Sequence, residues 1–551
     1  MKRTLAFLML SVLIVFSAGG IEMQKVAPVK NVILLIPDGT SLATVSLARW
    51  LMNYESGEQT VNKLAIDPYI CGTVITHSSN APIGDSAPTT SCYMTGYPSL
   101  TGFVSTYPPA DPENDIYPVD PTRAYRPLTT VLEAARWKFN KATGLVVTCE
   151  YPHATPADCA AHSWQRDNYK WISPQMVHNN IDVVIGGGAA IISEKEIEYL
   201  KGKNHSVYLN DIEKMRNDKS TKMWALFGKR TMSYEIDRDP AAQPSLEEMT
   251  RIALGKLDKS KEGFFLMVEG SRIDHAAHDN DPATMAREML AFDKACRVAF
   301  EFAKKNKNTA IVILPDHGNS GISIGVRSRE AYDRLSKKEL FGNLSKYRMS
   351  ASELALRINP KRVKHPEDTI MKYTGIRPTR SDIDALNAAD TARLKDWVSR
   401  WMTAQTFIGF TTGGHTGEEV FLAAWHPQGH VPSGVNTNVE INAYLCALLG
   451  LSHKDLDALT EKYYAPDSTL FDKNKYDRAI ITENSETFLK VTNRSNKREI
   501  RLPAHTNLVI RRANASALPD TAYAPSVAIH VDVNKQFYIN GDALKGYLDK
   551  P

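Results

Sequence analysis

Short, continuously apolar runs recur along the chain between residues 31 and 425, and helical patterns separate them. The runs occupy residues 31–39, 144–148, 182–188, 264–270, 310–318 and 420–425. Strands without an apolar–polar alternation are typically buried on both faces of a parallel sheet. One amphipathic segment between them covers residues 285–302. The pattern predicts an α/β fold with a doubly wound, mostly parallel central sheet and helices on both faces.

The strand pattern stops at about residue 320 and resumes after residue 410, and the intervening segment is charged and helical in pattern. A Ser-x-x-Asp sequence at Ser381 has the form of a helix N-cap. Apolar side chains recur downstream at helical spacing, at Leu394, Trp397, Val398 and Trp401. We expect residues 320–410 to form a helical insertion that packs over the sheet.

The end of the chain has a third pattern, which begins at residue 477. Apolar and polar residues alternate there in short runs separated by turn residues, which is typical of short strands. We therefore predict a main domain over residues 25–476 and a small β-rich C-terminal module over residues 477–551.

The first 20 residues have the layout of a secretory signal peptide. Lys2 and Arg3 precede an apolar stretch over residues 5–16, and small residues follow. This stretch is too short to span a bilayer comfortably, although a retained N-terminal anchor is the alternative interpretation. No second long apolar segment follows. We expect an exported protein, periplasmic or extracellular, without a stable membrane span once residues 1–20 are removed.

Composition and charge are those of an ordinary globular protein. The 551 residues are 43% apolar and 23% charged, with a net charge of +4 and no long basic run. Nothing therefore indicates a nucleic-acid-binding module. The six cysteines lack Cys-x-x-Cys spacing, which argues against a thiolate metal site. Some could pair in an exported protein, and Cys149 with Cys159 is the obvious local pair, but the sequence leaves the pairing open.

Acidic and histidine residues lie next to several of the predicted strands. They are Asp38, Glu269, Asp316, His317 and His415, joined by Asp274 and His278, which are four positions apart as on one helix face. Taken singly, each has an ordinary explanation as a cap, a turn residue or a buried histidine. Together they map to one edge of the predicted sheet, where carboxylates would repel one another unless cations bound them. Mixed carboxylate and imidazole ligands suit zinc, and an oxygen-only set suits magnesium.

Ser86 is a candidate nucleophile. It follows Gly84 and Asp85 and precedes a helical pattern with Pro88 in its first turn. A serine at a helix N-terminus faces backbone N–H groups and the positive end of the dipole, which favour an anion. The ordinary alternative is that Ser86 only caps the helix. Competing hydroxyls lie further inside the helix, on Thr89, Thr90 and Ser91.

A third polar segment follows the predicted strand at residues 144–148. It contains His153 and Thr155, and Arg166 comes one helical segment later. An arginine fork is suited to binding two oxygens of a phosphate group. The ordinary alternative for Arg166 is a surface salt bridge.

The combination of these segments resembles the alkaline phosphatase family, within the wider superfamily of metal-dependent phosphatases, phosphodiesterases and sulfatases. The matching sequences are IPDG, GDSAPTTSCYMTG, HATP followed by HSWQR, VEGSRIDHAAH, LPDHG and GGHTGEE. They occur in the family's order and span roughly residues 31–425. Short fragments such as DSA or DHG are weakly specific alone, whereas the full set is highly specific.

The resemblance implies a role for each matching residue. Ser86 would be the nucleophile, and Arg166 would clamp the phosphate. One zinc would bind to Asp274, His278 and His415. A second zinc would bind to Asp38, Asp316 and His317. Magnesium would bind to Asp38, Thr155 and Glu269, with His153 and His275 behind these ligands at positions that vary within the family.

The reaction implied by the resemblance is hydrolysis of small phosphate monoesters through a phosphoserine intermediate. A phosphodiesterase of the same superfamily is the nearest alternative, but those enzymes commonly use threonine and lack the third metal site. A sulfatase would need a Cys/Ser-x-Pro-x-Arg motif, and no arginine follows Ser86 at that spacing. A metal- or phosphate-binding scaffold without turnover is the non-enzymatic alternative. The resemblance also places the insertion over the site mouth, and dimers are common in the family, so a homodimer is one expected state.

Overall fold

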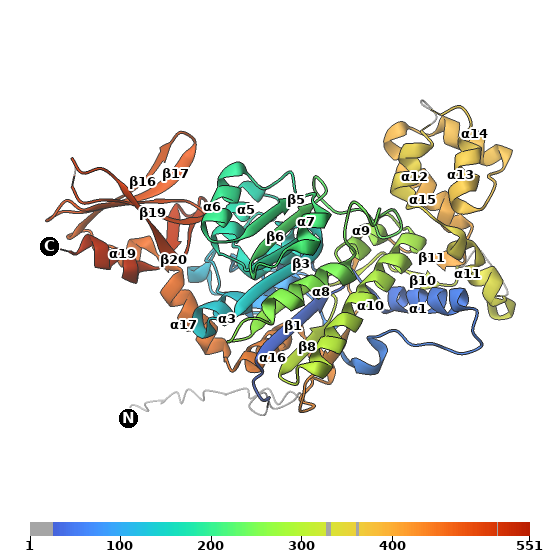
Figure 1. Ribbon diagram of the computed structural model, residues 1–551, viewed down its shortest axis with the longest axis horizontal. Coiled ribbons are helices and arrows are strands. Elements are labelled where there is room, and N and C mark those ends of the chain that lie inside the picture. The colour runs from blue at the N-terminus through green and yellow to red at the C-terminus, as the bar shows by residue number, and fades with distance from the viewer. Residues whose placement is uncertain (1–25, 327–331, 360–362, 515, 551) are drawn as a thin grey trace, which may run out of the picture.

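The computed structural model describes residues 26–326, 332–359, 363–514 and 516–550 (Figure 1). The predicted signal peptide, residues 1–20, lies outside the described residues. Within the described ranges, none of the helices combines the length and the apolar character needed to cross a bilayer.

A ten-stranded sheet forms the centre of the main domain (Figure 1). In spatial order its strands are β14 (Gly434–Thr437), β2 (Ile70–Ile75), β13 (Val420–Trp425), β8 (Thr309–Ile313), β1 (Asn31–Ile36), β7 (Phe264–Glu269), β3 (Ala142–Glu150), β4 (Val183–Gly187), β6 (Met223–Phe227) and β5 (Ser206–Leu209). Strand β13 is antiparallel to both of its neighbours, and every other neighbouring pair is parallel. The prediction of a mostly parallel α/β sheet is confirmed, with a strand in each of the six apolar runs.

Side chains of the central strand β1 alternate between two cores, one on each face of the sheet. Val32, Leu34 and Ile36 join one core, and Ile33 and Leu35 join the other. The first core includes side chains from α2 (Ser86–Thr95), α3 (Val131–Phe139) and α16 (Asn438–Leu449). The second includes side chains from α1 (Leu42–Ser56), α8 (Leu246–Leu257) and α10 (Pro282–Lys305). Helices therefore cover both faces, and the helix predicted over residues 285–302 lies within α10.

Four strands fall outside the predicted runs. Strands β5 and β14 lie at the two edges of the sheet, and β2 lies next to β14. All three are at least partly exposed, so they lack the continuous apolar run of a strand buried on both faces. Strand β6 is fully buried and does have a continuous apolar run, but this run is only five residues long.

Among its described residues, the insertion contains five α-helices. They are α11 (Lys337–Lys346), α12 (Ala351–Arg357), α13 (Pro366–Thr374), α14 (Arg380–Ala388) and α15 (Leu394–Ala404). Their apolar side chains form a core with Leu47 and Leu51 of α1 and with Met285 and Ala286 of α10. The expectation that the insertion packs over the sheet is corrected in this respect, because α1 and α10 already cover that face. In Figure 1 the helices α12–α15 lie at one end of the molecule, beyond α1.

The predicted helix cap at Ser381 is wrong. Thr379 is the N-cap of α14, and its hydroxyl and the Asp382 carboxylate satisfy each other's backbone N–H groups. Ser381 lies inside the helix and is exposed. Downstream, α15 is a separate helix that buries Leu394, Val398 and Trp401 and partly buries Trp397.

A seven-stranded sheet forms the C-terminal module. Its strands are β15 (Ala465–Pro466), β16 (Tyr476–Glu483), β17 (Glu486–Asn493), β18 (Glu499–Pro503), β19 (Thr506–Arg512), β20 (Asp520–Val531) and β21 (Gln536–Ile539). All neighbouring pairs are antiparallel, and α19 (Gly541–Leu548) packs on the same core. The predicted β-rich module is present, and its sheet also includes a short strand at residues 465–466.

The cysteines are all free. The structure describes all six, and none forms a disulfide. Cys159 Sγ faces the carbonyl oxygen of Thr155 at 3.7 Å, while Cys149 Sγ faces Glu269 Oε2 at 3.5 Å. The two thiols therefore have different partners, and the local pair considered from the sequence is not formed.

Candidate active site

The central strands deliver several acidic and histidine residues to one edge of the sheet. Strand β1 pairs with β7 and with β8, all in parallel, so their carboxyl ends lie together. Glu269 is the last residue of β7, Asp38 follows β1, and Asp316 and His317 follow β8. The sequence prediction that these residues converge is consistent with this placement.

His415 reaches the same edge through a small antiparallel pairing. It lies in β12 (His415–Thr416), which pairs with β9 (Gly318–Asn319) directly after His317. The His415 and His317 rings stack with their centroids 3.7 Å apart. Helix α9 (Arg272–His278), which follows β7, adds Asp274 and His278.

Asp274, His278 and His415 lie close together as candidate metal ligands, and we call them the first ion group. His278 Nε2 lies 3.4 Å from Asp274 Oδ2, and His415 Nε2 lies 3.8 Å from Asp274 Oδ1. The two histidine Nε2 atoms are 3.1 Å apart. These are the three residues that the resemblance assigns to one zinc.

Asp38, Asp316 and His317 form the second ion group. His317 Nε2 lies 3.6 Å from Asp38 Oδ1 and 3.3 Å from Asp316 Oδ2. All three residues are fully buried. The two groups adjoin, because ligand atoms of Asp274, His317 and His415 also lie within 4.8 Å of one another.

Backbone carbonyls define the tautomer of the three histidines. The Nδ1 atoms face the oxygens of Gly413 (2.8 Å from His278), Gly84 (3.0 Å from His415) and Gly318 (3.1 Å from His317). A carbonyl oxygen only accepts, so each Nδ1 carries the proton and each Nε2 presents a lone pair. Two such lone pairs 3.1 Å apart repel each other, and a shared cation removes this repulsion. The donor set and its orientation therefore fit a divalent metal such as zinc.

Buried oxygens without hydrogen-bond partners support the same conclusion. Both carboxylate oxygens of Asp38, Asp316 Oδ2, Glu269 Oε1 and Thr155 Oγ1 have no partner among the described residues. Such atoms are rare in native proteins. Burial, followed by the charge of Asp316, raises the pKa of Asp38 well above its usual value. The same two causes, in the same order, raise the pKa of Glu269 to about 8. Bound cations would relieve both effects.

Asp274 differs from the other buried carboxylates. Burial alone would raise its pKa, but His317, His278 and His415 outweigh this effect and the net shift is downward. Asn319 Nδ2 also donates to Asp274 Oδ1 at 2.6 Å. Asp274 is thus held as a carboxylate among imidazole rings.

Ser86 lies beside the second ion group. Its Oγ is 3.2 Å from His317 Nε2. Ser86 is the first residue of α2, and the cap is Asp85, whose side chain accepts from the N–H of Ala87 at 2.8 Å. The interpretation of Ser86 as only a cap is therefore wrong. The competing hydroxyls lie within the helix, and Thr89 Oγ1 donates to the Asp85 carbonyl at 2.7 Å.

Arg166 contacts Asp85, the residue before Ser86. Its Nη1 lies 3.5 Å from Asp85 Oδ1 and its Nη2 donates to His153 Nε2 at 3.2 Å. Only 21% of its side chain is exposed, so it is not an ordinary surface salt bridge. Burial alone would lower the pKa of Arg166, but Asp85 and Asp38 outweigh this effect and raise it. The guanidinium is therefore charged and oriented next to Ser86's helix.

The third group of candidate ligands, called here the third pocket, is Cys149, His153 and Glu269, whose ligand atoms lie within 4.8 Å of one another. Thr155 lies in α4 (Ala154–Ala160), and His153 is the residue before that helix. The rings of His153 and His275 meet edge to face with centroids 5.8 Å apart. Burial and then Arg166 lower the pKa of His153 well below its usual value, while burial and then Arg272 lower that of His275 to about 4. Both rings are therefore neutral at neutral pH.

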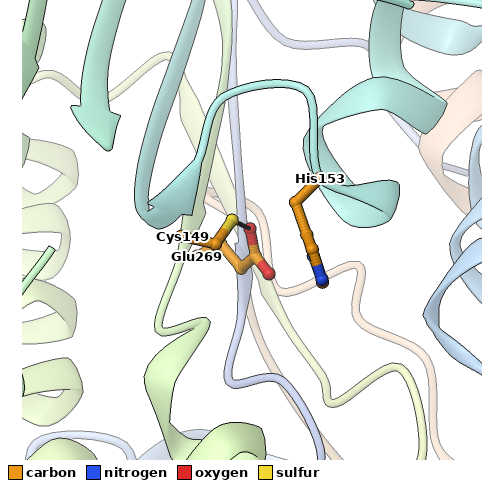
Figure 2. A group of neighbouring side chains, drawn as sticks. All are labelled: Cys149, His153 and Glu269. Atoms are coloured by element: carbon orange, nitrogen blue, oxygen red, sulfur yellow. Dashed lines mark hydrogen bonds between the residues drawn. The ribbon is translucent and has the colours of Figure 1, made fainter. Parts of the chain in front are cut away.

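Three residues of the site were not predicted from the sequence. Cys149 at the end of β3 lies with His153 and Glu269 in the third pocket (Figure 2). Asn319 holds Asp274, and Gly39 allows the Asp274 carboxylate to pass close to the backbone. A signal for Cys149 was available, because it is the last residue but one of β3, which pairs in parallel with β7, and Glu269 is the last residue of β7.

Known proteins resemble this chain over most of its length. The family model for alkaline phosphatase matches residues 29–451. Alkaline phosphatase 3 of Bacillus subtilis (strain 168) is 33% identical over 429 residues, which are 75% of this chain and 87% of that protein. The cold-active alkaline phosphatase from the psychrophile Shewanella sp. has a similar structure, with a TM-score of 0.68 and 25% identity, covering 76% of this chain and 99% of that one.

One further solved structure shares the fold. A variant of the alkaline phosphatase from the Antarctic bacterium TAB5, solved with Mg bound in its M3 site, has a TM-score of 0.53 and 22% identity, covering 78% of this chain and 100% of that one. The matched region of the family model contains every residue of the two ion groups, Ser86 and Arg166. The chain therefore belongs to the alkaline phosphatase family, whose members are metal-dependent phosphatases.

Proposed function

We propose that this protein hydrolyses phosphate monoesters to an alcohol and inorganic phosphate through a phosphoserine on Ser86, with two zinc ions and one magnesium ion as cofactors. The observation that carries the proposal is the convergence of three histidine Nε2 lone pairs and buried carboxylates beside Ser86 Oγ. Unaided monoester hydrolysis is extremely slow, and acid–base help contributes only about 10²–10⁴-fold. Charge stabilisation must therefore dominate.

We assign the cofactors to the groups described above. Asp274, His278 and His415 would hold one zinc. Asp38, Asp316 and His317 would hold the second. Asp38, Thr155 and Glu269 would hold magnesium, supported by their buried oxygens without partners in the described structure. When bound, these cations would lower the pKa of the Ser86 hydroxyl and stabilise the negative charge on the departing oxygen.

The chain's own groups would perform the remaining steps. Ser86 gives its proton to solvent, and its Oγ attacks phosphorus in line with the ester oxygen. The bond between phosphorus and that oxygen breaks, and the departing oxygen takes a proton from water to leave as the alcohol. Arg166 holds two non-bridging oxygens, so that phosphorus faces Ser86. Asp85 fixes both partners, because it caps the helix that begins with Ser86 and contacts the guanidinium of Arg166. Water then attacks the phosphoserine, the bond between Ser86 Oγ and phosphorus breaks, Oγ regains a proton from solvent, and phosphate is released.

The test of this proposal compares a chromogenic monoester with the matching diester. Purified protein loaded with zinc and magnesium should hydrolyse the monoester faster. Ser86→Ala should lower kcat by at least about a thousandfold, since it removes the nucleophile, while metal content is retained. Thr89→Ser, a change deeper in the same helix, is the control and should retain activity. Equal or faster diester hydrolysis would contradict the substrate class, and an active Ser86→Ala variant would contradict the nucleophile.

We also propose that the protein is exported and acts as a homodimer on small monoesters, without a nucleic-acid-binding module. The support for export is the signal-peptide pattern of residues 1–20. Mass spectrometry of the protein recovered outside the cytoplasm should show loss of this segment.

Light scattering should give about twice the mass of one mature chain, and the mass of a single chain would contradict the dimer.

A further inference from the structure

The third pocket contains a thiol as well as the oxygens of a magnesium site. Cys149, His153 and Glu269 each offer one ligand atom, and these atoms lie within 4.8 Å of one another. Figure 2 shows the three side chains converging, with the Cys149 sulfur next to one Glu269 oxygen. Cys149 and Glu269 are fully buried. The pocket therefore combines sulfur, nitrogen and oxygen donors.

Other donor atoms in this pocket are buried and have no hydrogen-bond partner. Within the described part of the chain they are Glu269 Oε1 and His153 Nδ1, and Thr155 Oγ1, two residues after His153, is a further such atom. Native proteins rarely leave such atoms unpaired, so they indicate a ligand that the pocket binds. Magnesium would use the two oxygens and leave the sulfur unused, because it prefers oxygen ligands.

The separation of sulfur and oxygen suits a tetrahedral cation. Cys149 Sγ and Glu269 Oε2 are 3.5 Å apart. Zinc binds thiolate sulfur at about 2.3 Å and carboxylate oxygen at about 2.0 Å, which places the two donors about 3.5 Å apart at a tetrahedral angle. Sulfur, imidazole and carboxylate ligands together favour a borderline-soft ion over magnesium.

We propose that the third pocket also binds a borderline-soft divalent cation such as zinc, with Cys149 as a thiolate ligand in place of its hydrogen bond to Glu269. On binding, the Cys149 S–H bond breaks, a sulfur–metal bond forms and the proton leaves to solvent, with no change in oxidation state. Magnesium and the softer cation compete for Glu269. The lack of Cys-x-x-Cys spacing excluded a site built of several thiolates, whereas this pocket uses one thiol with donors from other elements. This inference rests on the proposed function in one respect, because it assumes that cations occupy the two neighbouring ion groups.

The experiment uses the full-length protein stripped of metal and reloaded with cobalt(II). Cobalt replaces zinc and shows a near-ultraviolet thiolate charge-transfer band when sulfur binds it. We expect a band of one thiolate per chain in the unaltered protein and in Cys296→Ala, a buried cysteine of α10. Cys149→Ser should lose the band, and its zinc content after loading with zinc alone should fall from about three to about two per chain. A band that persists in Cys149→Ser, or is missing from the unaltered protein, would overturn the proposal.

A second measurement needs no variant, in case Cys149→Ser does not fold. X-ray absorption of the unaltered zinc-loaded protein should show sulfur at about 2.3 Å from a fraction of the zinc, and zinc with only nitrogen and oxygen neighbours would contradict the proposal. Monoester hydrolysis by the same preparations separates the two claims. Hydrolysis without a sulfur signal would overturn only this inference, whereas a sulfur signal without hydrolysis would overturn only the proposed function.

Discussion

Gly39 supports the site because it has no side chain. Its φ of 61° lies in the left-handed region, and a Cβ atom there would lie 2.4 Å from Asp274 Oδ1. Its backbone N–H donates to Asp316 Oδ1 at 3.0 Å. Gly39 therefore lies between a carboxylate of each ion group, and the spacing of those groups depends on it.

Gly39→Ala should reduce both zinc content and turnover. The added methyl group displaces Asp274, so we expect kcat/KM to fall at least about tenfold, which corresponds to about 1.4 kcal/mol. Gly57→Ala is the matched control, since Gly57 has a φ of 69° and nothing lies within 4 Å of its Cβ position. In both variants the left-handed backbone of the new alanine costs about 1–2 kcal/mol. Only the methyl group added at position 39 collides with a candidate metal ligand, Asp274. Equal zinc content in the two variants would contradict this role.

At the residue scale, the site residues that follow strands could be predicted from the sequence, but the residues that support them through distant contacts could not. Asp38, Glu269 and Asp316 follow apolar runs that pair in parallel, and that pattern places them together. Gly39 and Asn319 act through contacts with Asp274, more than 200 positions away for Gly39. Local patterns do not encode such distant contacts.

At the scale of elements, α14 shows how overlapping signals mislead. Both Thr379 with Asp382 and Ser381 with Asp384 fit the capping pattern. The structure uses the first pair, and Asp384 instead accepts from Arg380 Nε at 3.2 Å. The existence of a helix was predictable, but its first residue was not, because two caps two positions apart are nearly equivalent locally.

Thr379→Ala should destabilise α14, whereas Ser381→Ala should not. Loss of a threonine cap costs about 1 kcal/mol, and Ser381 is exposed within the helix. Hydrogen exchange of the α14 amides should quicken about fivefold in the first variant and stay unchanged in the second. The reverse order would show that Ser381 is the cap.

At the scale of the whole molecule, side chains far apart in sequence join the C-terminal module to the main domain. His178, the last residue of α5 (Tyr169–His178), faces Asn507 Oδ1 of β19 at 2.9 Å. Trp164 Nε1 donates to Asp532 Oδ1 at 2.8 Å. The strands of the module were predictable from their alternation, but these contacts were not. The family model ends at residue 451, so the module lies outside the matched region.

Acid should weaken this junction through His178. Burial lowers its pKa from 6.5 to about 4 despite the bond to Asn507, so between these values the unfolded chain binds the proton and the folded chain does not. The contribution is fully present above pH 6.5 and is lost as the pH falls to about 4, by up to about 3 kcal/mol. Thermal unfolding should show a smaller loss of Tm over this range in His178→Asn. His365→Asn is the control, because 75% of that side chain is exposed, and an equal effect in both would exclude His178.

The central claim is that the two ion groups bind divalent cations next to the Ser86 hydroxyl. Anomalous diffraction at the zinc edge from crystals of the active protein tests it most directly. We predict two peaks about 4 Å apart, one bounded by Asp274, His278 and His415 and the other by Asp38, Asp316 and His317, both beside Ser86 Oγ. An active protein without peaks at these positions, or with zinc only elsewhere, would contradict the account.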